Sequence, residues 1–289
     1  MFISLQEVFC RNFCFLAETK LIYQNTEKEN EFAMIFESHA HYDDNAFDKD
    51  RHLLLPEMHK NGIGYIINVT ADWESLLTTK RLTEQYDYVY GTVGIHPGDV
   101  ENLTEERIAS MMEYGKLDKI VAVGEIGLDY YYPEPEKDIQ KKWFARQLTM
   151  AGILGLPVII HSRDASSDTL EIMKRDSYKA LTGVIHCYSY SKETAKAFLN
   201  MGYYFGIGGV VTFQNAKKLV ETVEYLPMDR ILLETDSPYL APVPNRGKRN
   251  SSLNLPYIAE TIANIKGISS EEVIVQTCKN AKRLFSKIE

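Results

Sequence analysis

Short apolar runs recur along the chain from residue 34 onward, and amphipathic stretches separate them. Such runs, bounded by glycine or polar residues, are typical of strands that are buried on both faces. We interpret as strands residues 34–36, 65–69, 88–93, 120–123, 158–160, 183–185, 203–207 and 231–233. Apolar residues at helical spacing predict helices at residues 73–86, 105–114, 138–154, 166–175, 191–201, 216–225, 256–266 and 270–288.

Alternation of apolar strands with helices predicts a parallel sheet that is covered by helices. Eight such units match a closed TIM-type (β/α)8 barrel, which we expect to form a single domain over residues 34–289. An open, doubly wound sheet is the alternative. The first strand is not followed by the Gly-x-Gly-x-x-Gly turn typical of dinucleotide-binding sheets, so the barrel is favoured.

Residues 1–33 do not continue this pattern. Residues 1–16 are mildly apolar but lack the apolar core and cleavage site of a signal peptide, and residues 24–31 are polar and acidic, as in a linker. We expect that translation truly begins at Met34 and that the preceding residues are a poorly ordered extension. A short appended helix is the competing interpretation.

The composition excludes some partners. A net charge of −8 gives no basic surface for tight duplex binding, but it leaves room for a nucleic acid held by metal ions and a few arginines. No apolar stretch approaches the roughly 20 residues that a membrane span needs. The four cysteines form no Cys-x-x-Cys pair, which favours a cytoplasmic protein. No obligate protein partner is evident from the sequence.

Imidazoles and carboxylates follow five of the predicted strands. They are His39 and His41 after the first strand, Glu125 after the fourth, His161 after the fifth, His186 after the sixth and Asp236 after the eighth. The carboxyl ends of barrel strands meet at one mouth, so these side chains should gather in one polar site. Imidazole and carboxylate together are a ligand set for transition metals.

Each of these residues also has an ordinary structural interpretation. The i, i+2 spacing puts His39 and His41 on one side of a strand, yet an isolated His-x-His pair is more often two unrelated histidines. Glu125 could form a salt bridge, and Asp236 could cap a helix or turn. The joint occurrence decides for a metal site, because four of the seven histidines fall in this set.

Two further residues follow strands near the same mouth. We interpret His96, after the third strand, as a substrate-pocket histidine and not as a metal ligand. Arg163 stands two residues beyond His161, and its guanidinium is suited to phosphate oxygens. An ion pair between Arg163 and Asp164, or another acid of the loop, is the alternative.

A small basic cluster lies in the loop after the eighth strand. It consists of Arg246, Lys248 and Arg249, and it could attract phosphate, although such clusters are usually only solvated. Tyr188 and Tyr239 lie near strand ends and could stack on bases, but packing is their more ordinary role.

Seven segments together resemble the TatD family of metal-dependent hydrolases and deoxyribonucleases. They are M-I-F-E-S-H-A-H at 34–41, G-I-H-P at 94–97, G-E-I-G-L-D at 124–129, P-V-I-I-H-S-R at 157–163, I-H-C at 185–187, E-T-D-S-P-Y-L at 234–240 and R-G-K-R-N at 246–250. The resemblance runs from Met34 to Phe285. It implies a TIM-type barrel that holds a pair of divalent metal ions, which would be magnesium, manganese or zinc.

The resemblance also implies roles for individual residues. His39, His41 and Asp236 would hold one metal, His161 and His186 would hold the other, and Glu125 would bridge them. Glu125 and Asp236 would be the catalytic residues, with Asp236 also relaying a proton. Substrate would contact His96, Arg163, Arg246 and Arg249.

The implied activity is that of a deoxyribonuclease that cleaves phosphodiester bonds in an exonuclease-like way at DNA strand ends. A metal-dependent ester or amide hydrolase, such as an aminoacyl-tRNA deacylase, is the alternative, and a non-catalytic binding barrel is a weaker one. Two departures from the family pattern stand out. Glu37 replaces the usual Asp, and Asn250-Ser251-Ser252 replaces an Asn-Glu-Pro.

Overall fold

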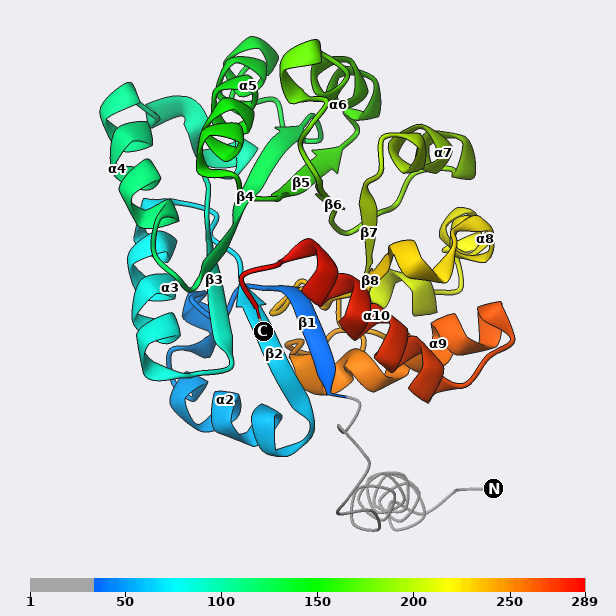
Figure 1. Ribbon diagram of the computed structural model, residues 1–289. Coiled ribbons are helices and arrows are strands. Elements are labelled where there is room, and N and C mark those ends of the chain that lie inside the picture. Colours follow the sequence, from blue (N-terminus) through cyan, green and yellow to red (C-terminus); the bar gives the residue numbers. More distant parts are fainter. Residues whose placement is uncertain (1–33, 289) are drawn as a thin grey trace, which may run out of the picture.

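Eight parallel strands pair in sequence order, each with the next one along the chain. They are β1 (Ile35–Ala40), β2 (Ile63–Asn68), β3 (Val89–Val93), β4 (Ile120–Asp129), β5 (Val158–Arg163), β6 (Gly183–Ile185), β7 (Tyr204–Ile207) and β8 (Ile231–Leu233). The computed structural model describes residues 34–288, so the expectations for residues 1–33 lie outside the described residues. Strands and helices alternate around a ring (Figure 1), which confirms the predicted barrel.

Helices connect successive strands on the outside of the ring (Figure 1), and the last helices of the chain follow β8. They are α2 (Arg51–Lys60), α3 (Trp73–Gln85), α4 (Glu105–Gly115), α5 (Lys137–Leu154), α6 (Ser166–Met173), α7 (Lys192–Asn200), α8 (Lys217–Tyr225), α9 (Leu255–Lys266) and α10 (Ser270–Leu284). Short 3-10 helices are η1 (Asn45–Phe47), η2 (Pro97–Asn102), η3 (Asp176–Tyr178), η4 (Gly209–Thr212), η5 (Met228–Arg230) and η6 (Ser252–Asn254).

Local sequence signals set several of these boundaries. Asp72 caps α3 by accepting a hydrogen bond from the backbone of Ser75, whose side chain in turn accepts from the backbone of Asp72. This reciprocal arrangement satisfies two of the unpaired N–H groups at a helix start. Helix α5 ends at Gly155, which has a φ of 65° that glycine adopts without steric cost.

Strand β4 is longer than predicted, because its glycines permit a close approach and do not end the strand. The sequence predicted a strand over residues 120–123, but β4 continues to Asp129. Gly127 has a φ of +148°, and a Cβ there would lie 1.9 Å from the carbonyl oxygen of His161. Glu125 and His161 therefore lie within strands β4 and β5, and not after them as the sequence suggested.

Apolar side chains fill the end of the barrel at which the strands begin. Phe36, Val121 and Leu232 belong to one buried cluster with Phe285, which follows α10. Phe36 stacks on Phe285 with a centroid distance of 6.2 Å. Figure 1 shows the C-terminal segment crossing this region, so the barrel is closed here and its polar site lies at the opposite end.

The barrel closes where β1 meets the segment after β8, a junction that we call the seam, and hydrogen bonds to Glu37 stabilise it. The backbone N–H of Asp236 donates to the carbonyl of His39 at 2.9 Å. Glu37 is fully buried and accepts hydrogen bonds from the backbone of His39 at 3.2 Å, from the backbone and hydroxyl of Thr235 at 2.9 and 2.7 Å, and from the hydroxyl of Ser252 at 2.8 Å. Burial raises the pKa of Glu37 to about 7, although these bonds oppose the rise.

We predict that Glu37→Ala destabilises the fold by about 3 kcal/mol or more, because it leaves several buried donors without an acceptor. Glu37→Gln keeps the acceptor oxygen and should cost only about 1 kcal/mol. Urea unfolding in the presence of a chelator measures both losses without a contribution from bound metal. Glu260→Ala, at an exposed position of α9, is the control. Unfolding of Glu37→Ala at the same urea concentration as this control would contradict the role of Glu37.

Candidate metal centre

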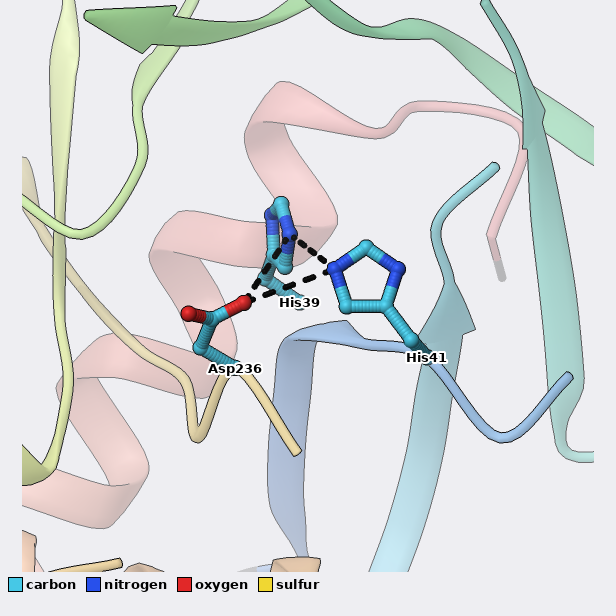
Figure 2. Close-up of side chains that lie close together, drawn as sticks. All are labelled: His39, His41 and Asp236. Atoms are coloured by element: carbon cyan, nitrogen blue, oxygen red, sulfur yellow. Dashed lines mark hydrogen bonds and ion pairs between the residues drawn. The ribbon is translucent and has the colours of Figure 1, made fainter. Parts of the chain in front are cut away.

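His39, His41 and Asp236 converge at the mouth of the barrel (Figure 2). The two Nε2 atoms lie 3.2 Å apart. Asp236 Oδ1 lies 3.4 Å from His41 Nε2 and 3.7 Å from His39 Nε2. His39 is fully buried, and the seam between β1 and the segment after β8 brings Asp236 alongside it.

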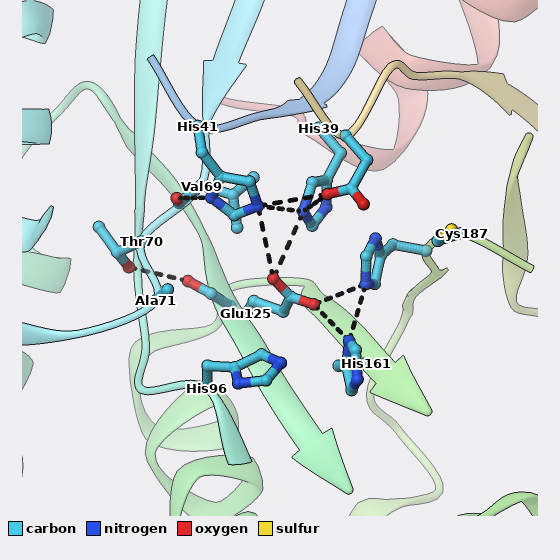
Figure 3. A network of polar contacts seen from close by, with 12 residues as sticks. His39, His41, Val69, Thr70, Ala71, His96, Glu125, His161 and Cys187 are labelled. Atoms are coloured by element: carbon cyan, nitrogen blue, oxygen red, sulfur yellow. Dashed lines mark hydrogen bonds and ion pairs between the residues drawn. The ribbon is translucent and has the colours of Figure 1, made fainter. Parts of the chain in front are cut away.

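Glu125 lies between this group and a second one (Figure 3). Its Oε2 atom is 3.4 Å from His39 Nε2 and 3.7 Å from His41 Nε2. Its Oε1 atom is 2.6 Å from His161 Nδ1 and 2.5 Å from His186 Nε2, and these two nitrogens are 3.1 Å apart. The structure therefore brings all six predicted ligand residues together around one carboxylate.

The donor atoms fit divalent metal ions. Ligands at 2.0–2.2 Å from a metal lie about 3.0–3.6 Å from one another, depending on the geometry. The atoms of His39, His41, Asp236 and Glu125 Oε2 are 3.2–3.7 Å apart in every pair measured. The donor atoms of the second group lie closer together, because Glu125 Oε1 is within hydrogen-bond distance of His161 Nδ1 and His186 Nε2. Mixed nitrogen and oxygen donors suit several divalent metals.

The protonation states of His39 and Glu125 depend on burial and on the neighbouring ionisable groups. Burial and the neighbouring His186 lower the pKa of His39 to about 4, so its imidazole is neutral and able to bind a metal. Burial opposes ionisation of Glu125, but His186 and His39 outweigh it and hold the pKa of this carboxyl well below its usual range. The bridging position thus holds a carboxylate.

Two other imidazoles, those of His41 and His161, favour the doubly protonated, positively charged form when no metal is bound. Burial disfavours the charged form of His41, but a hydrogen bond to Asp236 and the charge of Glu125 raise its pKa to about 10. For His161, hydrogen bonds to Asp129 and Glu125 likewise outweigh burial and raise the pKa to about 9. A metal ion would have to displace these protons, because only neutral imidazole is a ligand.

Neighbouring groups orient these imidazoles. His41 Nδ1 lies 2.8 Å from the carbonyl oxygen of Val69, and His161 Nε2 lies 3.1 Å from Asp129 Oδ2. Such partners fix the ring orientation of a metal-ligating histidine. Asp129 is not among the residues predicted from the sequence. Strand alternation continued past Gly127 would have placed it on the same side as Glu125.

Glu234 is a second residue that the sequence analysis did not single out. It is fully buried, and its Oε1 atom accepts a hydrogen bond from the backbone of Cys187 and lies 3.8 Å from His186 Nδ1. Burial raises the pKa of Glu234 well above its usual range. The sequence signal that could have indicated a role for Glu234 is its position two residues before Asp236.

His96 stands beside the second group. Its Nδ1 atom accepts a hydrogen bond from the backbone of Gly98 at 3.0 Å, and its ring meets the ring of His161 edge-on at 4.4 Å (Figure 3). Burial and the nearby His161 lower the pKa of His96 to about 3. With Asp129 and His161 it forms a further group of ligand-type atoms within 4.8 Å of one another.

The predicted arginines lie at the surface with defined neighbours. Arg249 forms hydrogen bonds of 2.8 and 2.6 Å with Asp50 and one of 2.7 Å with the carbonyl of Ala46. The Arg246 guanidinium lies 3.9 Å from the ring centroid of Phe213. A phosphate at Arg249 would therefore have to compete with Asp50.

Arg163 lies at the exposed end of β5. Its guanidinium is 3.8 Å from the ring centroid of Tyr131. This aromatic contact takes the place of the ion pair with Asp164 that the sequence left open as an alternative.

The two tyrosines named from the sequence differ in exposure. Tyr188 is buried and donates to the carbonyl of Ser191, so packing is its role. Tyr239 is 54% exposed and donates to Asp44.

Among residues 34–288, no helix has the length and apolar character that a membrane crossing requires.

Comparison with known proteins identifies the family. A family model described as TatD related DNase matches residues 36–286. The metal-dependent hydrolase YabD of Bacillus subtilis is 40% identical over 252 residues, which cover 87% of this chain and 99% of that protein. The 3'-5' ssDNA/RNA exonuclease TatD of Erwinia tasmaniensis is 31% identical over 246 residues, which cover 83% of this chain and 95% of that protein.

A solved structure agrees with these relatives. The crystal structure of YJJV, a TatD homolog from Escherichia coli, has a TM-score of 0.82 and 28% sequence identity, and the match covers 87% of this chain and 98% of that one. Barrel, ligand-type residues and sequence relatives thus agree, and the chain belongs to the TatD family of metal-dependent hydrolases.

Proposed function

We propose that this protein is a metal-dependent nuclease that hydrolyses phosphodiester bonds at the ends of single-stranded DNA. The observation that carries the proposal is the position of Glu125, whose two oxygens face two separate groups of imidazole nitrogens. A bridging carboxylate of this kind is suited to a pair of metal ions. The exonuclease name of the Erwinia tasmaniensis relative supports a nucleic-acid substrate.

The proposed cofactor is a pair of divalent ions, magnesium, manganese or zinc. In this assignment His39, His41 and Asp236 hold the first ion, His161 and His186 hold the second, and Glu125 contacts both. When bound, such a pair acidifies a water molecule and neutralises charge on the phosphate. The imidazoles of His41 and His161 stay in place because their second nitrogens are fixed by the carbonyl of Val69 and the carboxylate of Asp129.

Asp236 is the carboxylate best placed to accept the proton of the attacking water. Its side chain is 17% exposed, whereas that of Glu125 is 4% exposed. Its backbone has a φ of 59°, a left-handed conformation that few non-glycine residues adopt. Asp236 can therefore reach solvent while Glu125 remains between the imidazoles.

The proposed substrate contacts are His96, Arg163, Arg246 and Arg249. Arg163 follows His161 by two residues on β5, so its positive charge lies near the second group. The loop that carries the other two arginines is held to the Asp236 segment by Asn250, whose side-chain amide donates to the carbonyls of Thr235 at 3.0 Å and Tyr239 at 2.7 Å. So few cations favour a strand end over a long duplex.

Hydrolysis of an ester or amide, such as an aminoacyl ester on tRNA, is the second candidate. The net charge of −8 and the ion pair between Arg249 and Asp50 favour a small ester or amide over any nucleic acid, tRNA included, because both weaken attraction for a polyphosphate. Parallel assays on single-stranded DNA, duplex DNA, RNA, aminoacyl-tRNA and model esters distinguish the candidates. Hydrolysis of esters without cleavage of any nucleic acid would select the second candidate.

We expect equilibrium dialysis followed by metal analysis to find two divalent ions per chain. Glu125→Ala should retain at most one of them, because both groups lose a shared oxygen ligand. His52→Ala, at an exposed histidine of α2, is the matched control and should retain both. Two ions in Glu125→Ala would contradict the bridging role.

Cleavage of end-labelled single-stranded DNA should require a divalent metal and stop on addition of a chelator. Glu125→Ala and Asp236→Ala should each lower kcat/KM at least about 100-fold, since even changes next to metal ligands cost about 10- to 100-fold. Glu260→Ala should leave the rate unchanged. Activity at the level of the unaltered protein in both active-site variants would rule out this catalytic assignment.

A further inference from the structure

Two adjacent aromatic side chains project from the segment that follows β4. Tyr131 and Tyr132 are each 58% exposed, and their rings meet edge-to-face at a centroid distance of 4.9 Å. The Arg163 guanidinium lies 3.8 Å from the ring centroid of Tyr131 and 5.7 Å from that of Tyr132. The three side chains form one surface patch, which we call the tyrosine platform.

The tyrosine platform is linked directly to the metal centre. The backbone N–H of Tyr131 donates to Asp129 Oδ1 at 2.9 Å, and the other oxygen of Asp129 lies 3.1 Å from His161 Nε2. Arg163 pairs with Asp129 in the register between β4 and β5. A ligand on the platform would therefore lie beside the proposed second metal group.

The segment that carries the tyrosines is held in a fixed shape. Gln140 of α5 is buried, and its side chain accepts from the backbone of Asp129 at 2.8 Å and donates to the carbonyls of Asp129 at 2.9 Å and Pro135 at 2.7 Å. Tyr130 is tied to Arg163 through its backbone at 2.9 Å and to Asp168 through its hydroxyl at 2.7 Å. The two exposed rings therefore stand on a supported backbone.

We propose that the tyrosine platform stacks an unpaired nucleobase next to the phosphodiester bond that is cleaved. Aromatic faces bind bases without regard to sequence, and an arginine beside them adds a cationic plane that also attracts the neighbouring phosphate. A base inside a duplex is already stacked on its neighbours, so the platform selects single-stranded nucleic acid. The inference rests on the proposed nuclease function and assigns a base-binding surface to it.

The surrounding charges indicate a terminal base. Glu134 and Glu136 are exposed in the same segment and Asp164 is exposed next to Arg163, and these three carboxylates outnumber the adjacent exposed Lys137. Carboxylates at these positions repel a phosphate backbone that continues across the platform. The end of a strand avoids this repulsion, because no further phosphates follow the stacked nucleotide.

Two oligonucleotides test the proposal, identical except that one has abasic nucleotides at both ends. The unaltered protein should show a KM about 10-fold higher for the abasic oligonucleotide, with a similar kcat. The double variant Tyr131→Ala, Tyr132→Ala should show the same high KM for both. The matching pair of Phe substitutions should restore the preference, since stacking needs the ring and not the hydroxyl. Tyr225→Ala, at an exposed tyrosine of α8, is the control.

A binding measurement without catalysis separates this inference from the proposed function. With chelator present, an oligonucleotide carrying terminal 2-aminopurine should lose fluorescence on binding the unaltered protein, and about 10-fold more of the alanine double variant should be needed for the same loss. This binding result, combined with no cleavage in the assay that contains metal, would support the tyrosine platform and overturn the nuclease assignment. Cleavage and binding that are both indifferent to the tyrosines would overturn the platform alone.

Discussion

The structure depends on placing one carboxylate, that of Glu125, between four imidazoles where little water reaches. A buried charge of this kind is costly unless partners of opposite charge or a metal compensate it. Here the partners come from β1, β5 and the segment after β6, so no single stretch of chain could form the site. Only a closed barrel brings these strand ends within the 2.5–3.4 Å that separates Glu125 from His39, His161 and His186.

Hydrogen bonds between buried polar groups close the barrel, and Glu37 and Ser252, which both depart from the family pattern, take part in them. Glu37 stands where the family usually has Asp, and Ser252 stands where Pro is common. These two residues are in contact, since the Ser252 hydroxyl donates to Glu37 at 2.8 Å while its backbone donates to Tyr42 at 2.8 Å. Proline offers neither donor. The longer acid therefore has its own partner, and Glu37 and Ser252 act together at the seam.

The sequence predicted the barrel, and it predicted that six ligand-type side chains would gather at one mouth, because hydrophobic periodicity and strand-end position are local signals. It did not reveal Asp129 or the length of β4. The glycines at 124 and 127 looked like the end of a strand, but they mark a close approach to β5 that only the packed sheet reveals. For the same reason the sequence did not predict a role for Tyr131 and Tyr132, since their exposure depends on how Gln140 holds the loop.

Substrate recognition follows a different principle from the metal centre. The metal centre is nearly dry and uses charges that compensate one another, whereas the mouth around it is exposed and poor in cations. Arg249 is engaged by Asp50, and Arg163 lies over Tyr131. A protein with a net charge of −8 gains little from long-range attraction of nucleic acid. For the nucleic-acid substrate that we propose, affinity would then come from short-range contacts at the end of the nucleic-acid strand, and the aromatic faces of the tyrosine platform would supply them without a basic surface.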